Sequence, residues 1–92
     1  MIYVYTVECG DSYDPMPFHI LSKRELEHGE FHRMVEEAME HCRMEDGCIF
    51  MSRVIKYLLM AYSDIFVDHV YKAEIEYDRR NDRISQEYDV TI

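Results

Sequence analysis

The segment from Glu27 to Cys42 concentrates side chains that bind metal ions or carry charge, with three histidines, one cysteine and five glutamates. His28 and His32 are four residues apart, the spacing at which two imidazoles on one helical face share a zinc ion. Zinc requires a third or fourth protein ligand, and EHGEFH lacks the H-E-x-x-H order of metalloproteases. The histidine pair alone therefore does not define a zinc site.

A second candidate zinc site consists of His41, Cys42 and Cys48, which flank a turn and carry ligands that suit zinc. This set also lacks a fourth ligand, and Cys42 continues the apolar stripe that runs through Phe31 and Ala38. We expect Cys42 to pack in the core as a small hydrophobic residue. A zinc-binding protein or zinc-dependent enzyme remains the alternative function.

The glutamates of the same segment are typical of a solvated helix surface. Oppositely charged residues recur three or four positions apart, where they form weak surface pairs of about 0.2–0.5 kcal/mol. These pairs are His32–Glu36, Arg33–Glu37, Glu37–His41 and Glu40–Arg43. We therefore favour a charged helix surface over a metal site.

Catalytic motifs do not stand out in the chain. We find no glycine-rich phosphate loop, no Ser-His-Asp order and no paired-carboxylate motif. Cys9 closes a predicted strand, but no neighbouring histidine or cationic group marks it as an activated nucleophile. We expect a protein that is not an enzyme.

The charge of the chain limits its partners. Ten lysines and arginines against nineteen aspartates and glutamates give a net charge of -9, which repels nucleic-acid phosphates and attracts basic proteins. We predict a protein-protein interaction module whose acidic helix binds a basic surface, such as a nucleic-acid-binding face that it would block as an inhibitor or nucleic-acid mimic. The predicted contact residues are Glu30, Glu36, Glu37, Glu40, Glu45 and Asp46.

The first half of the chain predicts a strand and a helix. Residues 2–9 alternate β-branched and aromatic side chains on two mostly apolar faces, which indicates a central strand. Gly10 ends it, a proline-rich loop follows, and residues 18–21 are expected to be a short extended piece. Ser22 and Glu25 have the spacing of a capping box, so we expect a helix from Ser22, with a break near Gly29 and an end at Gly47.

A second helix is predicted within residues 48–67, where the apolar side covers about 200° of the circumference. A single buried face needs about half of that width. This helix is therefore either the central element of the core, covered by the sheet and the other helix, or a homodimer contact. The predicted contact residues are Met51, Ile55, Leu59 and Tyr62.

Residues 70–78 and 83–92 alternate apolar and polar side chains and predict a hairpin. With residues 2–9 as a third strand, the order is β-α-α-β-β. This order predicts an α+β two-layer sandwich, in which two helices cover one face of a three-stranded antiparallel sheet. The length suits one domain, residues 1–92.

The three cysteines, Cys9, Cys42 and Cys48, do not form the dense pattern of disulfide-rich secreted domains. The N-terminal residues lack the basic start and apolar run of a signal peptide. We therefore expect a cytoplasmic protein. No run of 18 apolar residues occurs, so we expect no membrane span.

Overall fold

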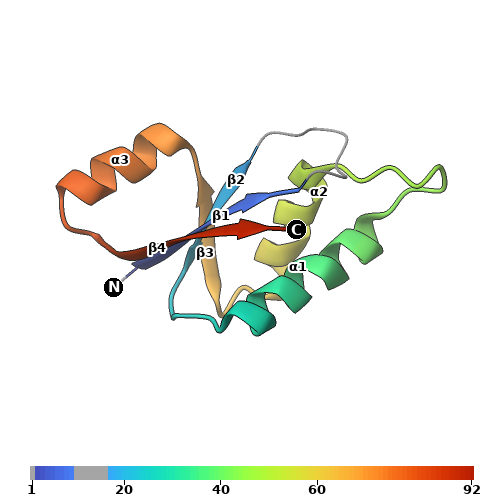
Figure 1. Ribbon diagram of the computed structural model, residues 1–92, viewed down its shortest axis with the longest axis horizontal. Coiled ribbons are helices and arrows are strands. Elements are labelled where there is room, and N and C mark those ends of the chain that lie inside the picture. The colour runs from blue at the N-terminus through green and yellow to red at the C-terminus, as the bar shows by residue number, and fades with distance from the viewer. Residues whose placement is uncertain (1, 10–16) are drawn as a thin grey trace.

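The computed structural model describes residues 2–9 and 17–92, with the side chain of Asp68 left aside. The predicted proline-rich loop after Gly10 lies largely outside these residues. Seven elements follow one another along the chain (Figure 1): β1 (Ile2–Glu8), β2 (Phe18–Ser22), α1 (His28–Cys42), α2 (Met51–Ala61), β3 (Phe66–Val70), α3 (Lys72–Arg80) and β4 (Ile84–Thr91).

The four strands form one mixed sheet in the order β3-β2-β1-β4. β1 pairs antiparallel with β2 and parallel with β4, and β2 pairs antiparallel with β3. The α+β class and the central position of β1 are confirmed. The prediction of a three-stranded, wholly antiparallel sheet was wrong, because it missed β2 and β3 as sheet members and the parallel pairing of β4.

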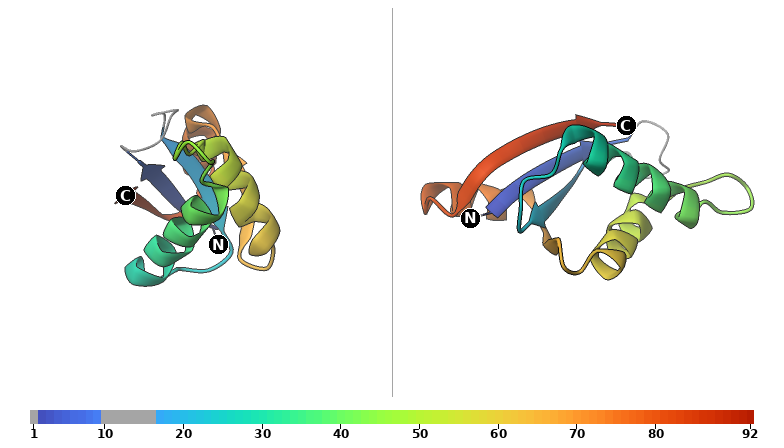
Figure 2. Two further views of the ribbon diagram at one scale, coloured as in Figure 1. Left: turned by 90° about the vertical axis from the view of Figure 1, so that its right-hand side faces the viewer. Right: turned by 90° about the horizontal axis from the view of Figure 1, so that it is seen from below.

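α1 and α2 lie together on one side of the sheet, as predicted (Figure 2). Their buried side chains meet alternate residues of the strands, such as Tyr5 and Val7 of β1 and Ile20 of β2. The Tyr5 ring stacks between those of Phe31, at 4.5 Å, and Tyr88, at 4.9 Å between centroids. This aromatic stack joins α1, β1 and β4 in one core.

α3 lies on the opposite face of the sheet. Side chains alternate along a strand, so the residues between those that face α1 and α2 point toward this side. Its Arg79 forms two hydrogen bonds with Glu87 of β4, and Ile75 is buried outside the main core. Figure 1 shows α3 well apart from α1 and α2. The molecule therefore has a partial third layer that the two-layer prediction did not contain.

The predicted hairpin of residues 70–78 and 83–92 was wrong, because most of its first strand is the helix α3. β3 and β4 occupy opposite edges of the sheet, with β2 and β1 between them, so no tight turn can connect them. The chain crosses that distance through α3, which occupies most of the predicted strand 70–78. β3 in turn includes residues that were expected to end the second helix, which stops at Ala61.

The predicted start of the first helix was also wrong. Ser22 ends β2 in a fully buried position, and its hydroxyl donates to the carbonyl of Arg24 and accepts from the Arg24 N–H. α1 begins at His28, so Gly29 lies in its first turn and does not break the helix. α1 ends at Cys42, before Gly47, which adopts a φ of +86° in the following turn.

Within the two described ranges, no helix combines the length and apolar character that crossing a bilayer requires.

Candidate functional site

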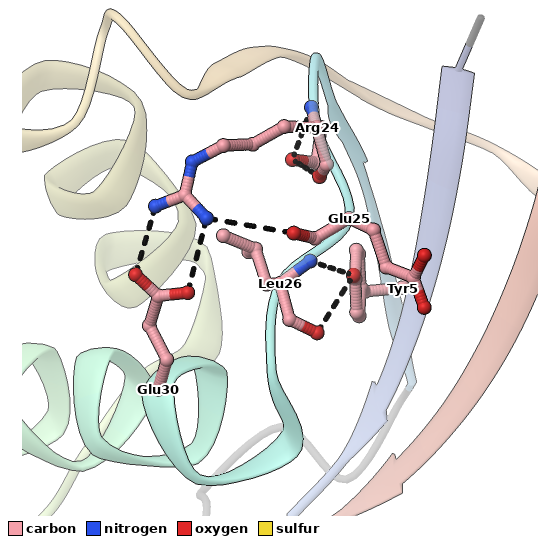
Figure 3. A network of polar contacts seen from close by, with 6 residues as sticks. Tyr5, Arg24, Glu25, Leu26 and Glu30 are labelled. Atoms are coloured by element: carbon pink, nitrogen blue, oxygen red, sulfur yellow. Dashed lines mark hydrogen bonds and ion pairs between the residues drawn. The ribbon is translucent and has the colours of Figure 1, made fainter.

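The position of α1 is fixed by the segment that precedes it (Figure 3). The Tyr5 hydroxyl accepts a hydrogen bond of 2.7 Å from the N–H of Leu26 and lies 3.4 Å from the Leu26 carbonyl, to which it donates. Leu26 is itself buried. A side chain from the central strand thus holds the chain two residues before α1 starts.

Arg24 and Glu30 form a two-point ion pair across the same segment, with nitrogen-oxygen distances of 3.1 and 2.8 Å. The hydrogen bond from Arg24 is the main cause that lowers the pKa of Glu30. Glu30 is half-buried, and its carboxylate is engaged within the chain. Of the six predicted contact residues, it is therefore the one least suited to meet a partner.

The other predicted contact residues are exposed, namely Glu36, Glu37, Glu40, Glu45 and Asp46. The opposite face of α1 is buried, with Phe31 at 1% and Val35 and Ala38 at 0% exposure, as the apolar stripe predicts. Because this face is locked into the core, the exposed carboxylates are held on a rigid support.

Three of these carboxylates border a single hollow of about 440 Å³, lined by Glu36, Glu37, Met39, Glu40, Arg43 and Ile92. Met39, which is buried, and Ile92, which packs against the core, form its apolar part. We call this the acidic hollow. A lysine or arginine suits such a site, because its aliphatic stem packs on apolar atoms while its charged end pairs with carboxylates.

Arg43 shows that a guanidinium can form an ion pair with a carboxylate of the acidic hollow. Its Nε lies 3.3 Å from Oε2 of Glu40, and a second nitrogen donates to the Gly47 carbonyl at 3.2 Å. This pair and the pair of His32 with Glu36, at 3.1 Å, were both predicted from the spacing. Both are surface pairs, and the charge of Arg43 partly neutralises the acidic face.

Glu37 and Asp46 also have contacts within the chain. Burial, followed by the charge of Glu37, raises the pKa of Tyr62, which places Glu37 beside α2. The Asp46 carboxylate accepts a hydrogen bond of 3.0 Å from the Cys48 N–H, and hydrogen bonds with Cys48 lower its pKa. Asp46 therefore stabilises the turn after α1 and lies beyond the acidic hollow.

The predicted zinc ligands are only partly brought together. The His28 and His32 rings lie 5.9 Å apart between centroids, on successive turns of α1. The His41 ring lies 4.4 Å from that of Tyr57, and burial raises the pKa of the Cys42 thiol, which opposes the thiolate form that zinc needs. Over residues 2–9 and 17–92, no three histidine, cysteine or acidic side chains converge as metal ligands.

The predicted homodimer surface is largely used by the chain's own core. Met51 is only 2% exposed, and Ile55, Leu59 and Tyr62 are half-buried against the core. The wide apolar side of α2 thus packs on the sheet and on α1.

Sequence reasoning did not identify Met39 and Ile92 as site residues. Met39 flanks the apolar stripe and gave a weak signal, whereas Ile92 reaches the hollow only through the pairing of β4 with β1. A second hollow, between α2 and α3, was missed entirely because α3 was predicted as a strand.

Comparison with known protein families, with curated proteins and with solved structures finds no match to this chain. Its function therefore has to be inferred from its own residues.

Proposed function

We propose that this protein is a non-enzymatic binding domain that docks its acidic hollow on a basic surface of a partner protein. One observation carries the proposal: Glu36, Glu37 and Glu40 line the acidic hollow beside its apolar part, on a helix whose other face is buried in the core. A lysine or arginine of the partner would insert there, with its stem on Met39 and Ile92 and its charge beside the carboxylates.

The charge of the whole chain supports the same kind of partner. A net charge of -9 increases the rate of encounter with basic proteins and repels competing acidic ones. Nucleic-acid-binding faces are rich in lysine and arginine. A partner of this class would be blocked by the domain while the two are bound, which makes an inhibitor the specific form of the proposal.

Capture of partners from a lysate of the native source, with the purified domain as bait, tests this function. We expect a basic protein to be retained at low salt and released as the salt rises from about 0.02 to about 0.3 M, because surface charge interactions are screened. Replacing Glu36, Glu37 and Glu40 by glutamine should abolish the capture without unfolding the domain, since all three side chains are exposed.

A matched variant separates the site from overall charge. Replacing Glu8, Glu27 and Glu76 by glutamine removes the same charge from exposed positions that neither line the acidic hollow nor belong to the predicted contact residues. This control should still capture the partner. Equal loss in both variants, or capture that is insensitive to salt, would contradict docking through the acidic hollow.

A further inference from the structure

A hollow larger than the acidic hollow lies between α2, α3 and the start of β2. Its volume is about 590 Å³, within the usual range of about 300–1,000 Å³ for small-molecule sites. It is lined by Pro17, Phe18, His19, Met51, Ser52, Ile55, His69, Val70, Tyr71, Lys72 and Ala73. We call it the α2–α3 hollow.

The lining is apolar over most of its surface. Phe18 and Met51 are buried, Ile55 and Val70 are half-buried, and Tyr71 stands exposed at the rim. These side chains come from β2, α2, β3 and the start of α3, so four separate elements shape the hollow. Such a surface favours the apolar part of a ligand.

Lys72 is the one lysine or acidic residue among the described residues that line this hollow. None of the described residues that line it is an aspartate or glutamate, although the chain contains nineteen. The ionisable groups in the lining are His19, His69, Tyr71 and Lys72. Lys72 is therefore the positive side chain that a negative ligand group would meet in the α2–α3 hollow, while Glu87 and Asp89 border the adjacent hollow that shares His19 and Lys72.

His19 and Lys72 form the polar end of the hollow. Nδ1 of His19 lies 2.8 Å from the Thr6 hydroxyl, which fixes the orientation of the ring. Burial first, and then the nearby charge of Lys72, lower the pKa of His19. The lowered pKa favours the neutral imidazole, and Lys72 supplies the positive charge.

The backbone adds to this positive character. Met51 and Lys72, the first residues of α2 and α3, both line the hollow. The N-terminal ends of two helix dipoles, which carry partial positive charge, are therefore adjacent to it. The two helix dipoles add to the positive charge of Lys72. Most of the lining is still apolar.

We propose that the α2–α3 hollow binds a small apolar monocarboxylate, whose hydrocarbon part lies against Phe18, Ile55 and Tyr71 and whose carboxylate pairs with Lys72. Apolar walls and a single cationic end match that class of ligand in shape and charge. The site shares no residue with the acidic hollow and does not depend on the proposed docking function.

Titration of the labelled protein with octanoate, followed by amide chemical shifts in NMR spectra, tests this site. We expect saturable shifts at Ile55, Val70 and Ala73. Octylamine, which has the same chain and the opposite charge, should bind at least about tenfold more weakly, because Lys72 would repel it. Octanol, which is neutral, should lie between the two.

Variants of two lysines test the role of charge. Lys72→Gln should weaken octanoate binding at least about fivefold, as expected for the loss of a charge-assisted contact. Lys56→Gln is the matched control, because Lys56 is exposed on α2 and does not line the hollow. Equal affinity for octanoate and octylamine, or unchanged affinity after Lys72→Gln, would overturn the proposal.

A third variant tests the location. Ala73 is exposed in the first turn of α3 and lines the hollow, so Ala73→Phe fills space there without replacing a core residue. Octanoate binding should be lost while the urea midpoint of unfolding stays within the range of the lysine variants. Octanoate shifts that persist unchanged in Ala73→Phe would place the ligand elsewhere and refute the site.

Discussion

Tyr5 connects the core to the start of the candidate binding helix. Its ring lies between Phe31 and Tyr88, and its hydroxyl bonds both backbone groups of Leu26. The sequence shows Tyr5 only as one of several aromatic residues in a strand. Its specific contact with Leu26 depends on how the chain returns from β2, which no local pattern contains.

Tyr5→Phe keeps the ring and removes the hydroxyl, so it isolates that contact. The buried N–H of Leu26 would lose its acceptor, and such a loss costs about 1–3 kcal/mol in the free energy of unfolding. Urea denaturation monitored by circular dichroism measures this change. Tyr77→Phe, at a position that is 63% exposed, is the control and should change stability by less than about 0.5 kcal/mol.

The raised pKa of Tyr88 predicts that the folded protein loses stability at alkaline pH. Its hydroxyl donates a hydrogen bond of 2.6 Å to the Glu25 carboxylate, and this bond is the main cause that raises its pKa to about 12. In the unfolded chain a tyrosine ionises near pH 10. The contribution of Tyr88 is therefore complete below pH 10 and declines as the pH rises toward 12.

Unfolding of the protein and of Tyr88→Phe, measured from pH 8 to pH 12, tests this sign. The difference in stability between the two proteins should be largest at pH 8 and shrink above pH 10. A difference that grows in the alkaline range would show that the hydrogen bond to Glu25 does not hold Tyr88 protonated.

At the scale of elements, α1 and β1 could be predicted because their own residues determine which faces are buried. The spacing of Phe31, Val35 and Ala38 matches one helical face, and all three are buried. β1 has apolar residues on both faces, and Val4 and Val7, on opposite faces, are fully buried. In both elements the tertiary environment agrees with the local pattern.

α3 could not be predicted from the same kind of pattern. Residues 70–78 alternate in the manner of a strand, but only Ile75 of α3 is buried. Lysine, alanine, glutamate and arginine are good helix formers, and with little burial to favour a strand this preference prevails. Because β3 and β4 lie on opposite edges of the sheet, the connection between them has to cross the sheet.

The start of α3 depends on Glu74, whose carboxylate accepts a hydrogen bond of 2.9 Å from the Tyr71 N–H. Glu74→Ala should make the amides of α3 exchange with solvent about two- to fivefold faster, as loss of an N-terminal cap contact implies. Hydrogen exchange by NMR measures this. Glu76→Ala makes the same substitution in α3 and should have a smaller effect, and equal effects would contradict the cap.

At the scale of the whole molecule, the sequence showed the acidic part of the proposed docking site and nothing of the α2–α3 hollow. The acidic character of α1 follows from its glutamates, and their exposure follows from the opposing apolar stripe. The two hollows could not be predicted from the sequence, because each combines residues from distant segments. Ile92 joins the acidic hollow through β4, and Lys72 joins the α2–α3 hollow through a helix that was predicted as a strand.

The pairing of β1 with β4 has a mechanical consequence. The two strands run side by side in the same direction, from Ile2 beside Ile84 to Glu8 beside Thr91, so Ile2 and Thr91 lie at opposite ends of their shared ladder. A force that pulls these two residues apart loads the whole row of hydrogen bonds in shear. Bonds loaded together resist extension better than bonds that are peeled open one after another, so we expect this pairing to oppose stretching along this axis.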